Sequence, residues 1–298
     1  MLRRSGQPTI LPCMIKFAHI TVLLLVFLSS RSFCNDLSSA SRIASLSLAS
    51  DEILLDLLPS CGGVSRLIAL STLSEDSSMS SVTQKAHLIR GRVHSEPESL
   101  FALKPDLVIA ATFNRPELLK MTTARKIPLL TLTRFASAED IAHNIEQIGS
   151  VIGCKDKASL MKQDFLRKAS AVTKTGPRPT LLLYDPDLVI MGQGTLFDDL
   201  ATRAGASNVA STTGVKSWPK LDAEALLRMN PDAIVVLGSD SATARSTIKN
   251  HPAWGRLNAV KSGKIIFLTS RTAQSTSHYF ADAVTELGNK ISKINLLK

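Results

Sequence analysis

The sequence is poor in aromatic residues and cysteine, and it has no long run of charge of one sign. Only 5% of the 298 residues are aromatic, including two tyrosines and two tryptophans, and there are four cysteines. No CxxC pair occurs, so neither a thiol-redox motif nor a zinc ribbon is indicated. The formal net charge is +10, but the basic residues form no run and no stripe interleaved with aromatics. We therefore expect no nucleic-acid partner.

The motifs of common enzyme classes are missing as well. The sequence contains no GxSxG, no HExxH and no phosphate-binding P-loop. The segment Gly192-Gln193-Gly194-Thr195 matches part of a dinucleotide fingerprint but does not complete GxGxxG. We interpret it as a tight turn that caps a helix beginning at Leu196, where backbone N–H groups can meet a ligand carboxylate or phosphate. We predict no enzymatic activity and no cofactor.

The apolar run at Phe17–Leu28 is too short to span a bilayer, which takes roughly 20 residues. Basic residues precede it and small residues follow, so we predict a secretory signal peptide over residues 1–34 and a periplasmic location. A membrane anchor that is retained is the alternative, and Met14 is a second candidate for the start of translation.

Two cysteines lie outside this leader. An oxidising compartment would allow Cys61 and Cys154 to form a disulfide. The alternative is two separate small apolar side chains, and the sequence leaves both open.

Strand and helix signals alternate along the rest of the chain. Short apolar, β-branched runs predict strands over residues 42–48, 67–70, 107–111, 127–132, 180–184, 233–237 and 265–269. We expect the first helix to begin with Ser50 as N-cap. A long helical stretch without strand signals separates two such regions. We therefore predict an α/β fold of two similar lobes, residues 42–153 and 177–298, joined by a single long helix over 154–176, with a ligand cleft between the lobes.

One motif occurs twice, which supports two related lobes. ESLFALKPDLVI at Glu98–Ile109 and EALLRMNPDAIV at Glu224–Val235 share Glu, Leu, Pro and Asp at the same offsets. In the first copy of the motif the helix should end at Lys104, because a residue that precedes proline disfavours the α conformation. Each lobe is thus expected to contain the same unit of helix, Pro-Asp and strand.

Five segments together resemble the helical-backbone class of periplasmic substrate-binding proteins. They are RIASLSLASDEILLDLLP, GRVHSEPESLFALKPDLVIA, GQGTLFDDLATRAGASNVA, SWPKLDAEALLRMNPDAIVV and HPAWGRLNAVKSGKIIFL. The resemblance covers nearly the whole chain after the leader. It implies a monomeric receptor that captures a ferric siderophore, haem or cobalamin and delivers it to an inner-membrane ABC permease. A receptor for bare manganese or zinc, and an adaptor without transport, remain the alternatives.

The resemblance also assigns roles to particular residues. Glu98 and Glu224 fall where receptors of this class pair with permease arginines; without such a role they are first-turn acids favoured by the helix dipole. Trp218 matches a cleft tryptophan of cobalamin receptors, although a local packing anchor is the alternative. A haem receptor would use Tyr184 or Tyr279 as an axial iron ligand.

Ligands of α/β folds bind beyond the carboxyl ends of strands. This rule predicts ligand contacts from residues that follow the predicted strands: Ser50, Asp51, Ser71, Thr112, Asn114, Arg115, Tyr184, Gln193, Gly194, Trp218 and Arg271. The arginines could clamp an acidic siderophore. The histidines show no HxH or HxxxH spacing, so we predict no bare metal site, with His94 and His278 the residues to watch. The scarcity of aromatics favours a siderophore or small chelate, and cobalamin stays open.

Overall fold

The computed structural model describes residues 39–94, 96–170 and 178–293. The predicted signal peptide, residues 171–176 of the predicted joining helix and residue 177 lie outside the described residues. Residues Leu37–Lys298 form one compact unit. Among the described residues, no helix has the length and apolar character needed to cross a membrane.

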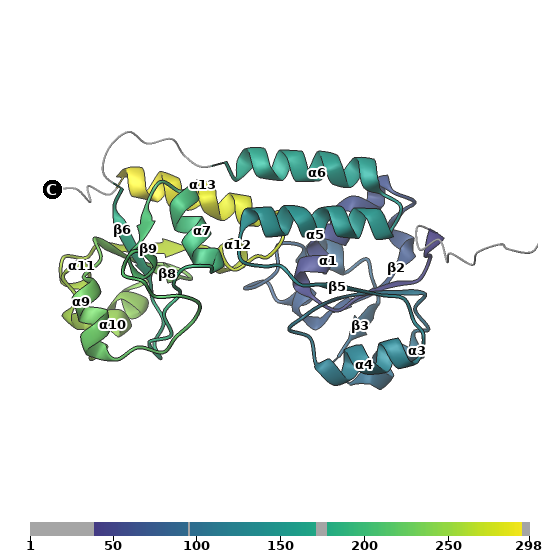
Figure 1. Cartoon of the computed structure of the whole chain (residues 1–298), viewed down its shortest axis with the longest axis horizontal. Helices are drawn as coiled ribbons and strands as arrows, with labels where there is room; N and C mark the ends of the chain where they lie inside the picture. Colours follow the sequence, from purple (N-terminus) through teal and green to yellow (C-terminus); the bar gives the residue numbers. More distant parts are fainter. Residues whose placement is uncertain (1–38, 95, 171–177, 294–298) are drawn as a thin grey trace, which may run out of the picture. The chain divides into compact units, whose positions relative to one another are not determined.

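The first sheet has five parallel strands in the order β3-β2-β1-β4-β5 (Figure 1). Their bounds are β1 Ile43–Ser45, β2 Leu67–Ser71, β3 Gly91–Val93, β4 Leu107–Ala111 and β5 Leu129–Leu132. All five residues of β4 are buried, as expected for a parallel strand covered on both faces. Leu107 and Ile109 pack with α1 (Leu48–Leu57) and α5 (Ala138–Val151). Val108 and Ala110 pack with α3 (Pro97–Ala102) and α4 (Pro116–Ala124) on the other face.

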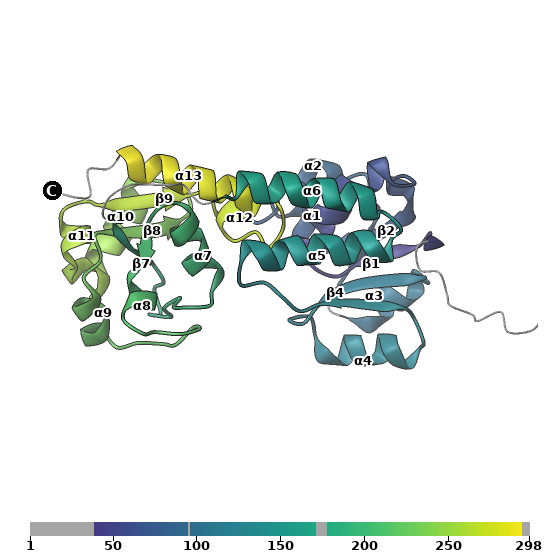
Figure 2. The same ribbon diagram turned by 45° about the horizontal axis from the view of Figure 1, so that its top comes forward.

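The second sheet has four parallel strands in the order β7-β6-β8-β9 (Figure 2). They are β6 Thr180–Leu183, β7 Ser207–Asn208, β8 Ala233–Leu237 and β9 Ile265–Leu268. Helices α7 (Leu196–Arg203) and α13 (Phe280–Lys293) share a core with one face. The other face packs on α8 (Val209–Thr212), α9 (Ala223–Met229), α10 (Ala242–Asn250) and α11 (Asn258–Lys261). The remaining elements are α2 Thr83–Ala86, α12 Ser270–Ala273 and the 3-10 turns at Leu58–Ser60, Val64–Arg66, Thr72–Glu75 and Trp254–Arg256.

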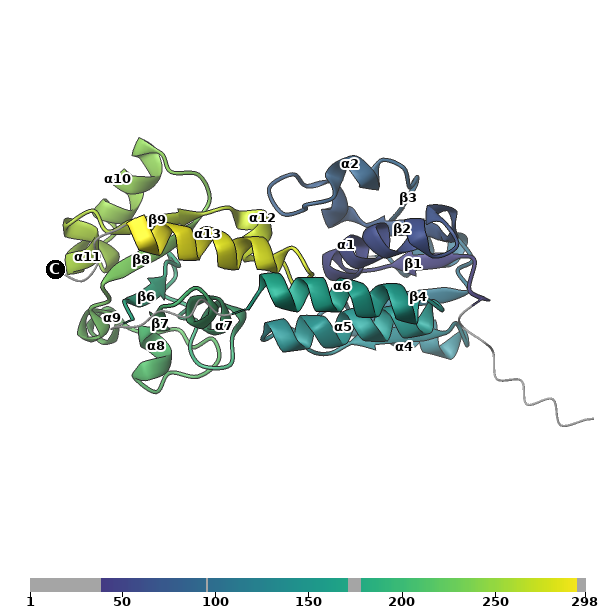
Figure 3. The same cartoon turned by 90° about the horizontal axis from the view of Figure 1, so that it is seen from above.

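Helix α6, Lys155–Lys168, follows α5 and packs along it (Figure 3). Buried side chains of α5 and α6 belong to the same core cluster as those of α7 and α13. One apolar core therefore runs from elements of the first sheet to elements of the second. The predicted α/β fold is confirmed.

Two predicted details of local structure are wrong. The N-cap of α1 is Ser47, whose Oγ accepts a hydrogen bond from the Ser50 N–H at 3.3 Å. Ser50 lies inside the first turn, because Leu48 and Ala49 are already helical. The strand predicted over residues 42–48 ends at Ser45 for the same reason: the apolar run continues into the helix. A continuous apolar run does not distinguish a buried strand from a buried helix turn.

The repeated motif forms the same local structure in both places. Lys104 follows α3 with φ 47°, and Asn230 follows α9 with φ 38°. Both residues precede the Pro-Asp pair that leads into a central strand, β4 or β8. The left-handed conformation at these equivalent positions ends the helix and turns the chain toward the sheet.

A disulfide joins Cys61 to Cys154, with their Cα atoms 5.9 Å apart. It links the turn after α1 to the N-cap of α6. Arg66 reinforces the junction, because its guanidinium donates to the carbonyls of Cys61 and Ile152, each at 3.0 Å.

Candidate functional site

An apolar cavity of about 350 Å³ lies at the carboxyl ends of strands from both sheets. Phe113 follows β4, Phe135 follows β5, and Leu183 and Leu237 end β6 and β8. The lining comprises these four residues with Met191, Leu196, Phe197, Leu200, Trp218, Ala273, Gln274 and Thr276. This is the edge of parallel sheets at which ligands bind.

Two of the four aromatic side chains that line the cavity are unusually accessible. Phe113 is 64% exposed and Trp218 is 55% exposed. Phe113 also packs on Phe135, with ring centroids 5.0 Å apart and the rings tilted by 52°. Exposed apolar surface that gathers in a concave site commonly marks a binding site.

The loop that carries Trp218 is held by backbone hydrogen bonds on both sides. Ile190 N–H donates to the Pro219 carbonyl and Gly192 N–H donates to the Ser217 carbonyl, both at 2.9 Å. A Cβ atom at Gly192 would lie 2.2 Å from the Val215 carbonyl oxygen, so this close approach requires glycine. The first glycine of the Gly-Gln-Gly-Thr motif therefore fixes the Trp218 loop.

The rest of that motif caps α7 as predicted. Thr195 is the N-cap, and its Oγ1 accepts a hydrogen bond from the Asp198 N–H at 3.4 Å. Gln193 and Gly194 are exposed in the turn. Neither Gln193 nor Gly194 is among the residues that line the cavity.

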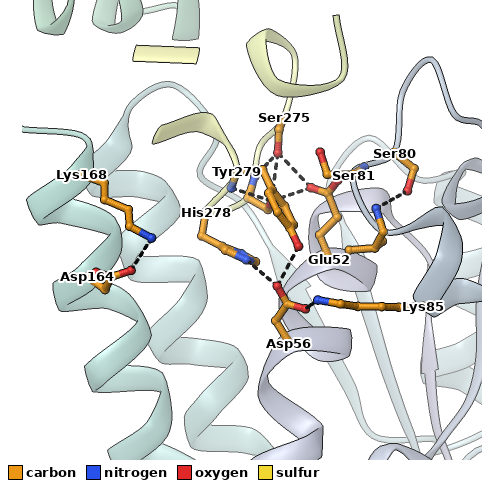
Figure 4. A network of polar contacts seen from close by, with 12 residues as sticks. Glu52, Asp56, Ser80, Ser81, Lys85, Asp164, Lys168, Ser275, His278 and Tyr279 are labelled. Atoms are coloured by element: carbon orange, nitrogen blue, oxygen red, sulfur yellow. Dashed lines mark hydrogen bonds and ion pairs between the residues drawn. The ribbon is translucent and has the colours of Figure 1, made fainter. Parts of the chain in front are cut away.

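Gln274 and Thr276 form the polar wall of the cavity. The neighbouring residues Ser275, His278 and Tyr279 belong to a network of polar contacts with α1 (Figure 4). Ser275 and Ser277 donate their hydroxyls to Glu52 on α1, which is fully buried. Burial raises the pKa of the Glu52 carboxyl, and hydrogen bonds from these serines and from the Ser81 N–H offset part of that rise.

A second carboxylate of α1 meets the residues that follow. His278 Nε2 and Tyr279 OH each lie 2.9 Å from Asp56 Oδ2, and Lys85 pairs with the other oxygen. Burial alone would raise the pKa of Asp56, but these hydrogen bonds outweigh it and lower the pKa to about 2. Neither Glu52 nor Asp56 is among the predicted site residues, because no local pattern links them to partners more than 200 positions away.

Ser50, Asp51 and Ser71, which were predicted to contact the ligand, are buried and bonded within the protein. Ser71 donates its hydroxyl to Asp51 Oδ2 at 2.5 Å, and Ser50 Oγ lies 2.7 Å from Ser47 Oγ. Burial raises the pKa of Asp51 to about 7 despite hydrogen bonds from Ser45 and Ser71. None of the three lines the cavity, so their hydrogen bonds brace β2 and the start of α1.

Thr112, Asn114 and Arg115 surround Phe113 in the turn after β4. The Asn114 side chain accepts from the Ala111 N–H and donates to the Leu46 carbonyl, both at 2.8 Å. Asn114 thereby fixes the turn that carries Phe113. Thr112 and Arg115 are exposed, and Arg115 lies 3.5 Å from Glu96.

The two tyrosines lie away from the cavity. Tyr184 packs on Trp254 with ring centroids 5.1 Å apart and on His251 at 6.3 Å. Tyr279 donates to Asp56. Tyr184 is therefore a half-buried aromatic that follows β6.

Arg271 lines a separate, polar cavity of about 280 Å³ together with Lys85 and several serines. Among the described residues, no group of three or more His, Cys, Asp or Glu side chains is placed to hold a metal ion. His278 is engaged with Asp56, and the exposed His94 donates its N–H to Ser99 Oγ at 3.2 Å.

Glu98 and Glu224 occupy equivalent sites. Each lies in the first turn of the helix that begins the repeated motif, and each is exposed. The Glu224 side chain is 86% exposed, with Arg228 3.9 Å away.

Comparisons with known proteins agree with this architecture. The chain is 27% identical over 214 residues to the uncharacterized ABC transporter substrate-binding lipoprotein YvrC of Bacillus subtilis, covering 67% of the chain and 66% of YvrC. It is 26% identical over 212 residues to the molybdate-binding protein MolA of Haemophilus influenzae, covering 63% of the chain and 60% of MolA. It is 27% identical over 155 residues to the vitamin B12-binding protein of Pectobacterium carotovorum, covering 49% of the chain and 55% of that protein. The chain thus spans between about half and two thirds of the length of these relatives.

Solved structures share the fold. The structure of a possible iron-binding, periplasmic solute-binding protein from Staphylococcus epidermidis superposes with a TM-score of 0.70 at 20% identity, covering 85% of this chain and 99% of the other. The family profile described as periplasmic binding protein matches residues 43–272, which include both sheets and the strand ends that form the cavity. The chain therefore belongs to the periplasmic binding protein family.

Proposed function

We propose that this protein is the substrate-binding component of an ABC importer, acting outside the cytoplasmic membrane and delivering a metal chelate to an inner-membrane permease. Family membership supports this proposal, as do the names of the relatives. The predicted signal peptide would export the chain. Glu98 and Glu224, exposed at equivalent sites, would orient it on a permease.

The observation that carries the proposal is the apolar cavity at the strand ends. At about 350 Å³ it lies at the lower end of the range for small-molecule sites, roughly 300–1,000 Å³. A compact chelate would fill it, or a larger macrocycle would insert one edge. The rings of Phe113 and Trp218 offer flat apolar surface for such a ligand.

The lining also favours one ligand class over others. Among the described residues, no arginine, lysine or tyrosine lines the cavity. A site for a strongly acidic siderophore or an oxyanion would need cationic donors, and haem ligation through tyrosine would need a phenol oxygen at the site. A chelate whose metal is already fully coordinated needs neither. We therefore propose that the cargo is a chelate of the corrinoid type, such as cobalamin, which presents an uncharged surface to the cavity.

Tryptophan fluorescence tests this assignment. Trp218 is exposed and lines the cavity, whereas Trp254 is fully buried under Tyr184. Purified protein would be titrated with cyanocobalamin, haemin and a panel of ferric siderophores, with correction for absorption by the ligand. Trp218→Ala would remove the reporter in the cavity and leave Trp254 as an internal reference.

We expect saturable quenching by cyanocobalamin that disappears in Trp218→Ala. Saturable binding of haemin or of an acidic siderophore instead would overturn the proposed ligand class. A lack of response to every chelate would contradict the receptor function and favour a non-transporting adaptor.

A further inference from the structure

The segment between α12 and α13 alternates between two environments. Gln274 and Thr276 line the apolar cavity. Ser275 and Ser277 are buried and do not line it, and Figure 4 shows Ser275 directed toward Glu52. The segment is a tight turn, in which Gln274 has φ −100° and ψ −3° and the Ser277 N–H donates to Ser275 Oγ. The two serines and the two lining residues are therefore neighbours in one short stretch of backbone. Whatever holds the two serines therefore also sets where the polar wall of the cavity lies.

Both serines are held by one carboxylate. Oε2 of Glu52 accepts hydrogen bonds from Ser277 Oγ at 2.5 Å and from Ser275 Oγ at 2.9 Å. Ser275 Oγ in turn accepts a hydrogen bond from the Ser277 N–H at 3.1 Å. Hydrogen bonds in a buried site are stronger than those exposed to water, because the surrounding dielectric constant is low. Glu52 thus fixes both the hydroxyls and the backbone of the segment.

The other oxygen of the same carboxylate reaches a different part of the chain. Oε1 of Glu52 accepts a hydrogen bond from the Ser81 N–H at 2.9 Å. Ser81 lies in the loop between β2 and α2 and lines the polar cavity that also contains Arg271. One buried side chain therefore connects the polar wall of the apolar cavity with a loop of the first sheet.

We propose that Glu52 is a positioning residue for the ligand. Through Ser275 and Ser277 it holds Gln274 and Thr276, the hydrogen-bonding side chains of the lining apart from the Trp218 indole. Through Ser81 it couples occupancy of the cavity to the loop after β2. This inference rests on the proposed function of the cavity as a ligand site.

The test compares two variants that each delete one hydroxyl donor to a carboxylate. Ser277→Ala removes one of the two hydroxyl donors to Glu52. The control, Thr180→Val, removes the donor to Asp232, which lies 2.7 Å away, and Thr180 begins β6 while the cavity lies at the far end of that strand. Glu52→Gln is the conservative variant, because it keeps an acceptor for the serines but removes the charge.

The probe is the dye anilinonaphthalene sulfonate, which fluoresces in apolar sites and does not depend on the identity of the natural ligand. We expect the wild-type protein to bind the dye and Trp218→Ala to lose most of the signal. The dye affinity should fall at least about fivefold in Ser277→Ala and stay within about twofold in Thr180→Val. Glu52→Gln should lie between the wild type and Ser277→Ala. Urea unfolding of each variant shows that the protein is folded under the conditions of the titration.

Hydrogen exchange supplies a readout that a purely structural role would not change. Dye saturation should slow exchange of the Ser81 amide in the wild type, and this effect should vanish in Ser277→Ala while it persists in Thr180→Val. Equal dye affinities in Ser277→Ala and Thr180→Val would overturn the inference, and so would a wild-type protein that binds no dye. Failure of the chelates to bind, with the dye results as expected, would instead count only against the proposed function.

Discussion

Asp106 and Asp232 have the same structural role in the two copies of the repeated motif. Asp106 accepts a hydrogen bond from the Arg42 N–H at 2.9 Å, next to the start of β1. Asp232 accepts one from the Thr180 N–H at 2.7 Å, at the start of β6. In each sheet the strand that follows the aspartate, β4 or β8, pairs with the strand whose start it caps. The Pro-Asp pair thus ties neighbouring parallel strands together at their amino ends.

Replacing either aspartate should destabilise the fold. Asp232→Ala removes the acceptor of the Thr180 N–H and hydroxyl, at a cost of about 1–3 kcal/mol for the unsatisfied donors. Asp106→Ala should cost a similar amount, and the two effects should add, because the sites share no partner. Urea denaturation measures the free energy of unfolding. The control Asp187→Ala, at an exposed loop position, should leave the free energy of unfolding unchanged. If the double variant Asp106→Ala/Asp232→Ala were no less stable than either single variant, the two aspartates would not have equivalent roles.

The repeat and the strand–helix alternation were readable from the sequence because they are local signals. The strand predicted over residues 107–111 is β4. In α5 the apolar residues recur at helical spacing, with Ile141, Ile145 and Ile148 buried. The N-cap of α1 was predicted at Ser50 but is Ser47, because both serines precede apolar residues of the helix and either could cap it.

The site was harder to predict because its parts are far apart in the chain. Trp218 was singled out and lies in the cavity, but Phe113 and Phe135 follow strands within polar turns, where no periodic signal marks them. Ser71 ends β2, and Ser50 and Asp51 lie in the first turn of α1, which follows β1. Their side chains bond to one another and to other buried groups. Position relative to a strand can be predicted from one sequence, whereas the direction of a polar side chain depends on tertiary contacts.

Removing the disulfide should lower stability. Cys61 and Cys154 close a loop with a sequence separation of 93 residues, so the link restricts the unfolded chain strongly. The double variant Cys61→Ala/Cys154→Ala should lose about 2–5 kcal/mol of unfolding free energy. Thermal unfolding with and without a reducing agent checks this. The reductant should lower the Tm of the wild type and leave that of the double variant unchanged; a wild-type Tm insensitive to full reduction would contradict the prediction.

The buried Asp51 should make stability depend on pH. Burial raises its pKa to about 7 in the folded protein, against roughly 3.9 in an unfolded chain. Between these values the folded protein holds a proton that the unfolded chain has released, so the free energy of unfolding falls as pH rises from about 4 to 7. The full effect is on the order of 4 kcal/mol. Asp51→Asn cannot titrate, so its stability relative to the wild type should increase across this window and stay constant above it.

Asp56 should behave in the opposite way and serves as the control for that experiment. Its pKa is lowered to about 2, so its stabilising contacts are present above about pH 4 and are lost as pH falls toward 2. Asp56→Asn should therefore be less stable than the wild type at neutral pH, and the difference should shrink in acid. Urea denaturation at a series of pH values reports both variants. Parallel curves for Asp51→Asn and the wild type between pH 4 and 7 would rule out the proposed titration.

The exposed acids of the repeated motif should govern transport without affecting capture. Glu98 and Glu224 are exposed in the first turns of α3 and α9, and neither lines the apolar cavity. Charge reversal to lysine at both sites should abolish uptake of labelled ligand in cells, because like charges would then face the permease arginines. Ligand affinity of the purified variant should match that of the wild type. The matched control is Glu117→Lys, which reverses the charge of an exposed first-turn acid of α4 and should transport normally. Weakened ligand binding in the double variant would show that Glu98 and Glu224 do not act by docking the permease. An equal loss of uptake in the control would show the same.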